Sequence, residues 1–392
     1  MGDTMTSEEL YTYTNHLLTQ VKKRGHNTEY ITEDNIYDTF GNITKKTMTA
    51  GSDSRVTNYE YDPSGRFLTK SIDIEGLATT FSYNTYNGFL NSKTNPYGLT
   101  TSYTYDPWFK KIKTTDYLGK SNTYAYSRSN SVYTLVTTTG DDGSGKEETF
   151  DDLGRKTKSG VKNINGTFSY VDYLYDIYDR NYKVSKPYFG ASPSQWNETT
   201  YDIYGRPTQS KSSTQKTVSM SYSGLTTTVN DGAKTKVSTK NAIGNVVSMT
   251  DTPGGTINYT YFANGNLKTS DYGRAVTTIL QDGWGRKTKL TDPSAGIYSY
   301  EYNGFGETTS ETSPNGTTTY TLDMVGKLTT KTISGTNTNS STSYAYDATT
   351  KLLTSARLQT YWKVAPLPRT VMNMTAPKDL SKLLKPHRML HL

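Results

Sequence analysis

The sequence contains no cysteine, only four histidines and few aliphatic residues. Without cysteine the chain cannot form a disulfide framework, a zinc–thiolate site or a cysteine nucleophile. Leucine, isoleucine, valine and phenylalanine number about 66, roughly 17% of the 392 residues, a fraction typical of disordered chains. No apolar run approaches the roughly 20 residues that a membrane-spanning helix requires, so we expect no membrane span.

Tyrosine is the abundant apolar residue instead. The sequence has 34 tyrosines against 10 phenylalanines and 4 tryptophans. Each tyrosine ring can bury a large apolar face while its hydroxyl finds a hydrogen-bond partner or water. The net charge of +7 is modest for this length, so the chain does not meet the high-charge condition for disorder. We therefore expect a folded protein that uses tyrosine as part of its core.

The positive charge is concentrated at the C-terminal end. Residues 357–392 contain seven basic residues and one acidic residue, Asp379, which leaves 36 basic and 35 acidic residues in the rest of the chain. A nucleic-acid groove requires lysine and arginine clustered across the folded body. The balanced body therefore argues against nucleic acid as a partner.

Glycine-containing turns recur about every ten residues. The segments 62–65, 95–98 and 116–119 each begin with Asp or Asn and end with Gly. This composition is typical of type I turns, in which the first side chain hydrogen-bonds the backbone and the glycine accepts a positive φ. Such turns at intervals of 8–12 residues indicate an antiparallel chain of β-hairpins.

Between the turns, tyrosines alternate with small or polar residues. Tyr59 and Tyr61, Tyr103 and Tyr105, and the trio in 298–302 place rings at i and i+2, which share one face of a strand. Helical spacing at i, i+3 and i+4 is absent from these stretches. The sequence therefore predicts an all-β fold of antiparallel β-hairpin repeats.

The turns of one class share a longer motif, in which Tyr-Asp is followed by two variable residues, Gly and often a basic residue. The motif residues that we single out as structural are Tyr37, Asp38, Gly41, Tyr61, Asp62, Gly65, Arg66, Tyr201, Asp202, Gly205, Arg206, Tyr261, Gly265, Gly285, Arg286, Tyr302, Gly306, Tyr346 and Asp347. With this motif in about a dozen copies, residues 30–350 resemble the RHS/YD-repeat family, whose hallmark is Tyr-Asp-x-x-Gly-Arg followed by an apolar residue and a second glycine turn.

The resemblance implies a long antiparallel strip that coils into a spiral shell. In bacterial members of the family such shells enclose a toxic C-terminal domain, and in teneurins they belong to a cell-surface adhesion protein. It therefore implies a non-enzymatic wall segment of a secreted or cell-surface protein, with other shell parts or an enclosed toxin domain as partners. The alternative is a secreted or cell-surface carbohydrate-binding or adhesive module that uses its tyrosines as a ligand surface.

Some copies depart from the motif. Residues 106–110 lack the turn glycine, Asp179 stands where glycine is expected, and Gln281 and Leu322 stand where tyrosine is expected. The region 127–200 is the least regular and contains an insertion-like stretch at 190–196. These departures make the individual hairpins uncertain, although the architecture does not depend on them.

Residues outside the motif give no strong catalytic or metal site. Residues 140–146 match a phosphate-binding loop, but Glu147 replaces the Ser or Thr that would hold Mg²⁺, and we expect a hairpin tip instead. The acidic residues around 141–152 lack calcium-loop spacing, and the four histidines adjoin no nucleophile motif. We therefore expect no enzymatic activity, no cofactor and no metal.

Three regions follow from these patterns. Residues 1–29 form an irregular lead-in without a visible signal peptide, residues 30–355 hold the repeats, and residues 356–392 form a basic tail outside the repeat pattern. For the tail we keep three interpretations: out-of-frame sequence after a disrupted gene, the start of a truncated variable C-terminus, or an interaction tail.

Overall fold

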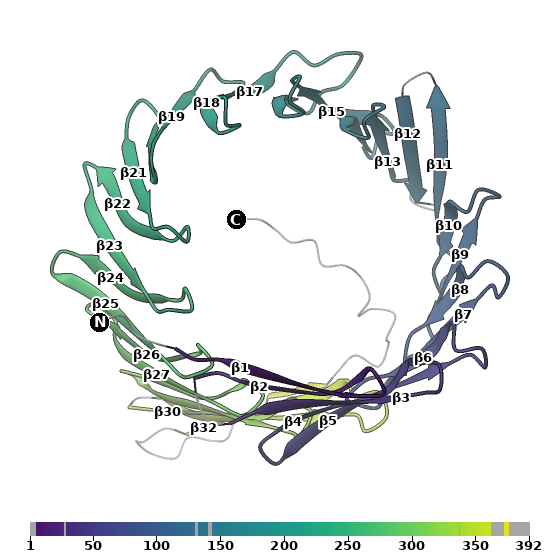
Figure 1. The fold of residues 1–392 in the computed structure, drawn as a ribbon, viewed down its shortest axis with the longest axis vertical. Helices are drawn as coiled ribbons and strands as arrows, with labels where there is room; N and C mark the ends of the chain where they lie inside the picture. Colours follow the sequence, from purple (N-terminus) through teal and green to yellow (C-terminus); the bar gives the residue numbers. More distant parts are fainter. Residues whose placement is uncertain are drawn as a thin grey trace. The chain divides into compact units, whose positions relative to one another are not determined.

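The computed structural model describes residues 5–26, 29–129, 132–139, 143–336, 338–361 and 372–375. Within these ranges all regular structure is β-strand, and the paired strands run antiparallel. Figure 1 shows the strands following one another as hairpins. The predicted all-β fold of antiparallel hairpin repeats is therefore confirmed. The described part of the chain has no helix that is long and apolar enough to cross a membrane.

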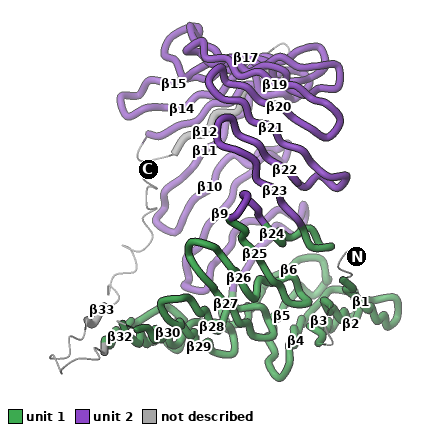
Figure 2. Tube along the Cα trace, turned by 90° about the vertical axis from the view of Figure 1, so that its left-hand side faces the viewer, with its two compact units in different colours: residues 1–78, 261–269, 275–392 green, residues 79–260, 270–274 purple. Residues whose placement is uncertain are grey.

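The chain divides into two compact units (Figure 2). Unit 1 comprises residues 1–78, 261–269 and 275–392, and unit 2 comprises residues 79–260 and 270–274. The strands of unit 1 are β1 (Glu8–Thr14), β2 (Leu17–Arg24), β3 (Ile31–Tyr37), β4 (Ile43–Ala50), β5 (Asp53–Tyr61), β6 (Leu68–Ile72), β25 (Ala275–Gln281), β26 (Lys287–Asp292), β27 (Gly296–Tyr302), β28 (Thr308–Ser313), β29 (Gly316–Leu322), β30 (Leu328–Gly335), β31 (Asn339–Tyr346), β32 (Leu353–Tyr361) and β33 (Met372–Thr375).

Unit 2 contains the remaining strands. They are β7 (Ala78–Tyr83), β8 (Leu90–Thr94), β9 (Thr100–Tyr105), β10 (Lys111–Thr115), β11 (Ser121–Ser129), β12 (Val132–Thr139), β13 (Gly145–Phe150), β14 (Lys156–Lys162), β15 (Phe168–Tyr175), β16 (Asn181–Ser185), β17 (Trp196–Tyr201), β18 (Pro207–Lys211), β19 (Thr217–Ser223), β20 (Thr226–Asn230), β21 (Thr235–Lys240), β22 (Val246–Thr252) and β23 (Gly255–Tyr261), with β24 (Leu267–Tyr272) crossing the boundary between the units.

The motif turns bend the strip by the predicted mechanism. Gly65 and Gly205 have φ of +68° and +78°, and each donates its amide to the carbonyl of the Asp three residues earlier. The pairing register shifts at the motif tyrosine, as between Thr200 and Tyr201. The extra residue lies in the strand that follows the turn, because Thr200 pairs with Gln209 whereas Tyr201 pairs with Pro207.

The copies that depart from the motif form the same turns. Phe109 and Asp179 take the glycine position with φ of +68° and +65°. Each still donates its amide to the carbonyl of the Asp at the start of its turn. The turns at 282–286 and 323–327 also form, although Gln281 and Leu322 precede them. The Asp at the start of the turn is therefore enough to define it.

The N-terminal residues are more regular than the sequence suggested. Strands β1 and β2, within the predicted irregular lead-in 1–29, pair as a hairpin through the two-residue turn Asn15-His16. Both turn residues have positive φ, +50° and +67°, which matches the twist of the flanking strands. Neither is glycine, which is why the sequence did not reveal this turn. At the other end β32 continues to Tyr361, past the predicted boundary at 355.

The strip has little enclosed core. Among the described side chains the buried apolar ones are Val21, Ala50 and Tyr188, and none is less than 2% exposed. Tyr188 follows β16 in the insertion-containing loop and bridges to Tyr170, with its hydroxyl donating to Asp172. Most tyrosines are half-buried, so ring packing along the strip replaces a central core.

In unit 1 a second layer lies on the C-terminal strands (Figure 1). We call β1–β5 the N-terminal layer. Its Arg55 pairs with Glu307, 252 residues further along the chain, and the His26 amide donates to the Gly283 carbonyl over 2.6 Å. The contact is close, because a Cβ on Gly25 would overlap the backbone of Gly283 and Trp284.

Candidate functional site

The motif carboxylate organises its own turn. In the turn at 176–180, Asp176 Oδ1 accepts the Tyr178 amide at 2.9 Å and the Arg180 amide at 3.0 Å, and Oδ2 accepts Arg180 Nε at 2.7 Å. The hydrogen bond from Arg180 lowers the pKa of Asp176. Asp151, Asp202 and Asp282 hold Arg155, Arg206 and Arg286 in the same way.

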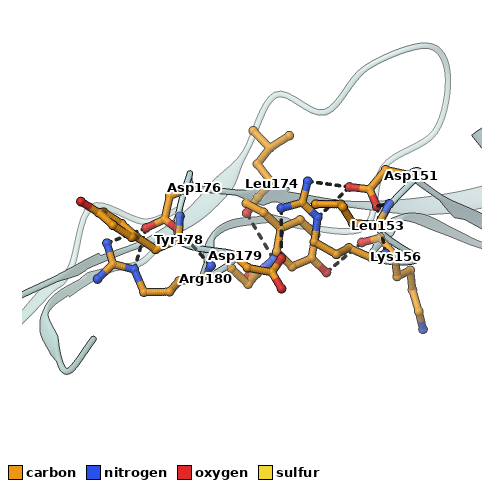
Figure 3. A network of polar contacts seen from close by, with 11 residues as sticks. Asp151, Leu153, Lys156, Leu174, Asp176, Tyr178, Asp179 and Arg180 are labelled. Carbon is orange, nitrogen blue, oxygen red and sulfur yellow. Dashed lines mark hydrogen bonds and ion pairs between the residues drawn. The ribbon is translucent and has the colours of Figure 1, made fainter. Parts of the chain in front are cut away.

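The motif base then reaches the next repeat. Arg180 Nη1 donates to the Asp202 carbonyl at 2.9 Å, and Arg155 Nη1 donates to Asp179 Oδ1 at 3.0 Å. Figure 3 shows the turns at 151–155 and 176–180 beside each other. In unit 1, Arg286 Nη1 donates to the Asn303 carbonyl at 3.1 Å. One guanidinium therefore fixes its own turn and the turn that follows.

The motif tyrosine of the next repeat completes the joint. The Arg180 guanidinium carbon lies 4.8 Å from the centre of the Tyr201 ring, and the Tyr201 hydroxyl donates to the Asn181 carbonyl at 2.6 Å. Arg286 lies 4.9 Å from the Tyr302 ring, whose hydroxyl donates to the Lys287 carbonyl at 2.8 Å. We call this repeated arrangement the tyrosine–arginine ladder.

The ladder extends through both units. Its other members pair a base with the tyrosine of the next repeat: Arg155 with Tyr175, Arg206 with Tyr222, Lys110 with Tyr126 and Lys327 with Tyr346. Each of these tyrosine hydroxyls donates to the carbonyl of the residue after the base. Each joint therefore combines a cation–π contact with a neutral hydrogen bond, and in the arginine copies also an exposed ion pair, so its strength comes from several small contributions.

The first two motif copies have further contacts within and between their turns. Arg66 Nε donates to Ser64 Oγ within its own turn. Asn42 replaces the base in the first copy and uses its amide, which donates to Asp38 and to the Gly65 carbonyl at 2.8 Å. At Gly65 a Cβ would also overlap the Phe40 ring, so this glycine serves both the turn and the packing.

The remaining motif residues lie in the turns or at the ends of the flanking strands. Gly41, Gly265, Gly285 and Gly306 have positive φ, and Asp347 Oδ1 accepts the Thr349 amide. Asp62 also accepts turn amides, and hydrogen bonds from Ser64 and from the Phe67 amide lower its pKa to about 2. Tyr37 donates its hydroxyl to the Leu18 carbonyl, while Tyr61 and Tyr261 lie at strand ends.

We number the motif positions from the tyrosine, so that the two variable residues are the third and the fourth. The fourth motif residue distinguishes the two units. We call the turns 282–286, 303–307 and 323–327 the unit 1 turn row, and the turns 151–155, 176–180 and 202–206 the unit 2 turn row. The fourth residues of the unit 1 turn row are half-buried: Trp284, Phe305 and Val325. The fourth residues of the unit 2 turn row are exposed: Leu153, Tyr178 and Tyr204.

The N-terminal layer accounts for that difference. Arg55 lies across the unit 1 turn row, with its guanidinium carbon 3.9 Å from the centre of the Phe305 ring. Arg55 Nη2 pairs with Glu307 Oε2 at 2.8 Å and Nε donates to the Met324 carbonyl at 3.2 Å. The hydrogen bond from Arg55 lowers the pKa of Glu307. Lys327 adds an ion pair with Glu75 at 2.8 Å.

Glycine at the third motif position permits this close cover. Gly283 lies against Gly25, and a Cβ on Gly304 would come within 3.0 Å of Ala50 Cβ. In the unit 2 turn row the third position holds Asp152, Ile177 and Ile203. Sequence analysis did not single out Arg55, Glu307 or Gly25, because no local pattern shows that they meet. The sequence did contain one indication of this close packing, which is glycine at the third motif position in both 283 and 304.

The same covered region contains a cavity that is open to solvent on one side. It has a volume of about 580 Å³ and lies within unit 1 between the N-terminal layer and the unit 1 turn row. Its lining includes Tyr30, Asp53, Trp284, Tyr302 and Asn303. Aromatic faces beside carboxylate and amide groups are suited to polar ligands that also have apolar faces.

The weaker sequence candidates have no shared site. His16 lies in the β1–β2 turn, and His26 Nδ1 accepts the Thr6 amide at 3.1 Å. His387, His391 and residues 140–142 of the phosphate-loop match lie outside the described residues, while Gly145 and Lys146 begin strand β13. In the described ranges no group of three or more histidine, aspartate and glutamate side chains is placed to hold a metal ion.

Comparison with known proteins identifies the fold. No protein-family model and no curated protein matches the sequence. The chain is similar to the crystal structure of TcdB2-TccC3, with 13% identity and a TM-score of 0.54 over 93% of this chain and 22% of that one. The chain is also similar to the crystal structure of TcdB2-TccC3-Cdc42, with 13% identity and a TM-score of 0.57 over 94% of this chain and 21% of that one. A third similar structure is the Photorhabdus luminescens Tc holotoxin pore, with 14% identity and a TM-score of 0.54 over 94% of this chain and 21% of that one.

These similarities have a defined extent. The chain spans about a fifth of the length of the chains that it matches. At this identity the likeness concerns the fold alone.

Proposed function

We propose that this chain is a non-enzymatic structural protein, a wall segment of an RHS/YD-type shell that encapsulates or displays a C-terminal effector. The observation that carries the proposal is the tyrosine–arginine ladder. In the ladder the charged and aromatic residues of the motif link each repeat to the next, as a continuous wall requires. The parent protein is proposed to act outside the cell or at its surface.

The similarity to toxin complexes supports this choice among structural roles. The matched structures include a complex whose name contains Cdc42 and a holotoxin pore, and the present fold corresponds to about a fifth of each matched chain. A strip of repeats is stabilised by neighbouring repeats, so further wall is the natural partner of its ends. Other shell parts and an enclosed effector are therefore the proposed partners.

Small-angle X-ray scattering on the full chain tests the wall proposal. A curved wall around an empty volume gives a pair-distance distribution shifted toward long distances relative to a solid particle of 43.7 kDa. A distribution typical of a flat, fully extended sheet would overturn the proposal. Expression in cells tests its non-enzymatic part, since toxicity that disappears on removal of residues 356–392 would contradict it.

A second candidate function is carbohydrate binding, which the unit 1 cavity favours. Trp284 and Tyr302 line it together with Asn303 and Asp53, and sugars bind through ring stacking combined with hydrogen bonds. Screening on a glycan array tests this candidate. Binding lost in Trp284→Ala and retained in Trp108→Ala would support it, because Trp108 is exposed on a turn of unit 2 and does not line the cavity.

A further inference from the structure

The unit 1 cavity carries two carboxylates that the fold does not use. Glu29, two residues before β3, and Asp53, the first residue of β5, both line the cavity, and both are exposed. Asp53 accepts a hydrogen bond from the Ser52 hydroxyl at 3.4 Å. Within the part of the chain that the structure describes, neither carboxylate pairs with a lysine or an arginine. Both negative charges are therefore available to a ligand in the cavity.

The basic residue of the lining is already paired. Arg286 Nε donates to Asp282 Oδ2 at 2.6 Å, and Arg286 Nη1 donates to the Asn303 carbonyl at 3.1 Å. The guanidinium also lies over the Tyr302 ring as a member of the tyrosine–arginine ladder. Its charge is thus compensated within the wall. The charge that the cavity offers to a ligand is therefore negative.

The aromatic rings of the lining differ in the same respect. The rings of Tyr30 and Tyr302 already have the guanidinium carbons of Arg24 and Arg286 at 5.4 and 4.9 Å from their centres. Among the described residues, no cation and no second ring lies against Trp284. Tryptophan is the aromatic side chain that attracts cations most strongly. Trp284 is therefore the ring of the cavity that can receive a ligand.

We propose that the unit 1 cavity binds an amino sugar, a saccharide whose free amine carries a positive charge. The apolar face of the sugar ring packs on Trp284, and the ammonium group pairs with Asp53 and Glu29. This inference rests on the second candidate function, carbohydrate binding, and adds the charge of the sugar. Acidic saccharides are excluded by the same two carboxylates.

Both layers of unit 1 contribute to this site. Glu29 and Asp53 flank the strands of the N-terminal layer, whereas Trp284 belongs to the unit 1 turn row. The site is complete only when the layer covers the row. A bound ligand should therefore stabilise the covered state and raise the midpoint of thermal unfolding.

Isothermal titration calorimetry on the full chain at pH 6 tests the proposal with two matched ligands. One is a tetramer of β-1,4-linked glucosamine, whose amines are charged, and the other is the same tetramer with every amine acetylated. We expect the charged tetramer to bind about tenfold more tightly, and added salt should reduce this difference. Asp53→Asn and Glu29→Gln should each weaken its binding about fivefold.

The control is Glu301→Gln, which also removes a negative charge from unit 1. Glu301 is exposed and precedes Tyr302 on β27, so its side chain lies on the opposite face of the strand and outside the cavity lining. This variant should bind the charged tetramer as the unaltered chain does. An unchanged thermal unfolding midpoint without ligand shows that the three variants fold.

The possible failures are distinguishable. Equal affinity for the two tetramers would overturn the charge assignment and leave carbohydrate binding in place, whereas no binding of either would overturn both. Spermidine carries ammonium groups without a sugar ring, and spermidine binding as tight as that of the charged tetramer would contradict the role of the sugar. An equal loss in Glu301→Gln and Asp53→Asn would show that the ligand does not bind in the cavity.

Discussion

The two turn rows have the same motif and the same ladder, yet one is covered and the other is exposed. Phe305 and Tyr204 occupy equivalent fourth positions, and Arg55 lies over Phe305, whereas Tyr204 is exposed. The turns themselves do not differ in backbone geometry, since Gly306 and Gly205 have φ of +86° and +78°. Two of the three covered turns have glycine at the third motif position, Gly283 and Gly304, and there the backbone admits a second layer; the third covered turn has Met324, whose carbonyl accepts from Arg55.

The largest expected effect exchanges that third residue. Gly304→Ile gives unit 1 the residue that unit 2 carries at 203, and its Cβ would collide with Ala50. We expect the free energy of unfolding, measured in urea, to fall by about 3 kcal/mol or more, because overpacking displaces the N-terminal layer. The reverse change, Ile203→Gly, should cost about 1 kcal/mol or less. Equal losses would contradict the role of the third position.

The fourth residue should show a smaller contrast. Phe305→Ser removes a ring that Arg55 covers, and it should cost about 2 kcal/mol. Tyr204→Ser removes an exposed ring and should change stability by about 0.5 kcal/mol or less. Urea unfolding of both variants measures the difference, and a large loss for Tyr204→Ser would show that the unit 2 turn row is covered within the chain.

Arg55 itself should contribute about 1–2 kcal/mol. Arg55→Met keeps the length of the side chain but removes the ion pair with Glu307, whose side chain is 30% exposed. The loss includes the cost of leaving that partly buried carboxylate without its partner. The control is Lys183→Met, which removes the more exposed ion pair with Glu198 in unit 2 and should change stability much less than Arg55→Met. The same loss for both variants would contradict the importance of the covering contact.

The pH dependence should follow the same ion pair. Because Arg55 lowers the pKa of Glu307 in the folded protein, the stabilisation is present above the ordinary value of 4.5 and is lost as the pH falls through the lowered value. Thermal unfolding between pH 6 and pH 3 should therefore show a steeper acid loss for the unaltered chain than for Arg55→Met. Parallel curves would contradict this assignment.

The smallest contrast concerns the ladder, which both units share. Tyr201→Phe in unit 2 and Tyr302→Phe in unit 1 each remove one hydroxyl that donates to a backbone carbonyl. Each should cost about 1 kcal/mol, because a partly buried carbonyl loses its hydrogen-bond donor. Urea unfolding should give nearly the same value for both. A clear difference would show that the ladder is not equivalent in the two units.

The sequence predicts the turns well, because their structure is local. Asp62 and Gly65 lie three residues apart, and their roles follow from side-chain and backbone chemistry alone. It predicts the hairpins at Phe109 and Asp179 less well, because the stable Asp-centred turn forces a non-glycine residue into positive φ. The ladder was only partly predictable, since the motif names the residues but not the contact between repeats.

The covered row could not be predicted from local patterns. Arg55 meets Glu307 across 252 residues, and nothing near Arg55 in the sequence indicates its partner. The hairpin at Asn15-His16 was missed for a different reason, because the turn uses two non-glycine residues with positive φ. Long-range packing and unusual turn residues are thus the two reasons why parts of the structure could not be predicted from the sequence.

Thiol labelling of single introduced cysteines tests the central claim most directly, because the chain has no other thiol. Phe305→Cys reports on the covered row, and Ile243→Cys reports on an exposed fourth position of unit 2. In dilute native solution we expect the thiol at 305 to react at least tenfold more slowly than the thiol at 243. Equal labelling rates would contradict the account, because they would show that the N-terminal layer does not cover the unit 1 turn row.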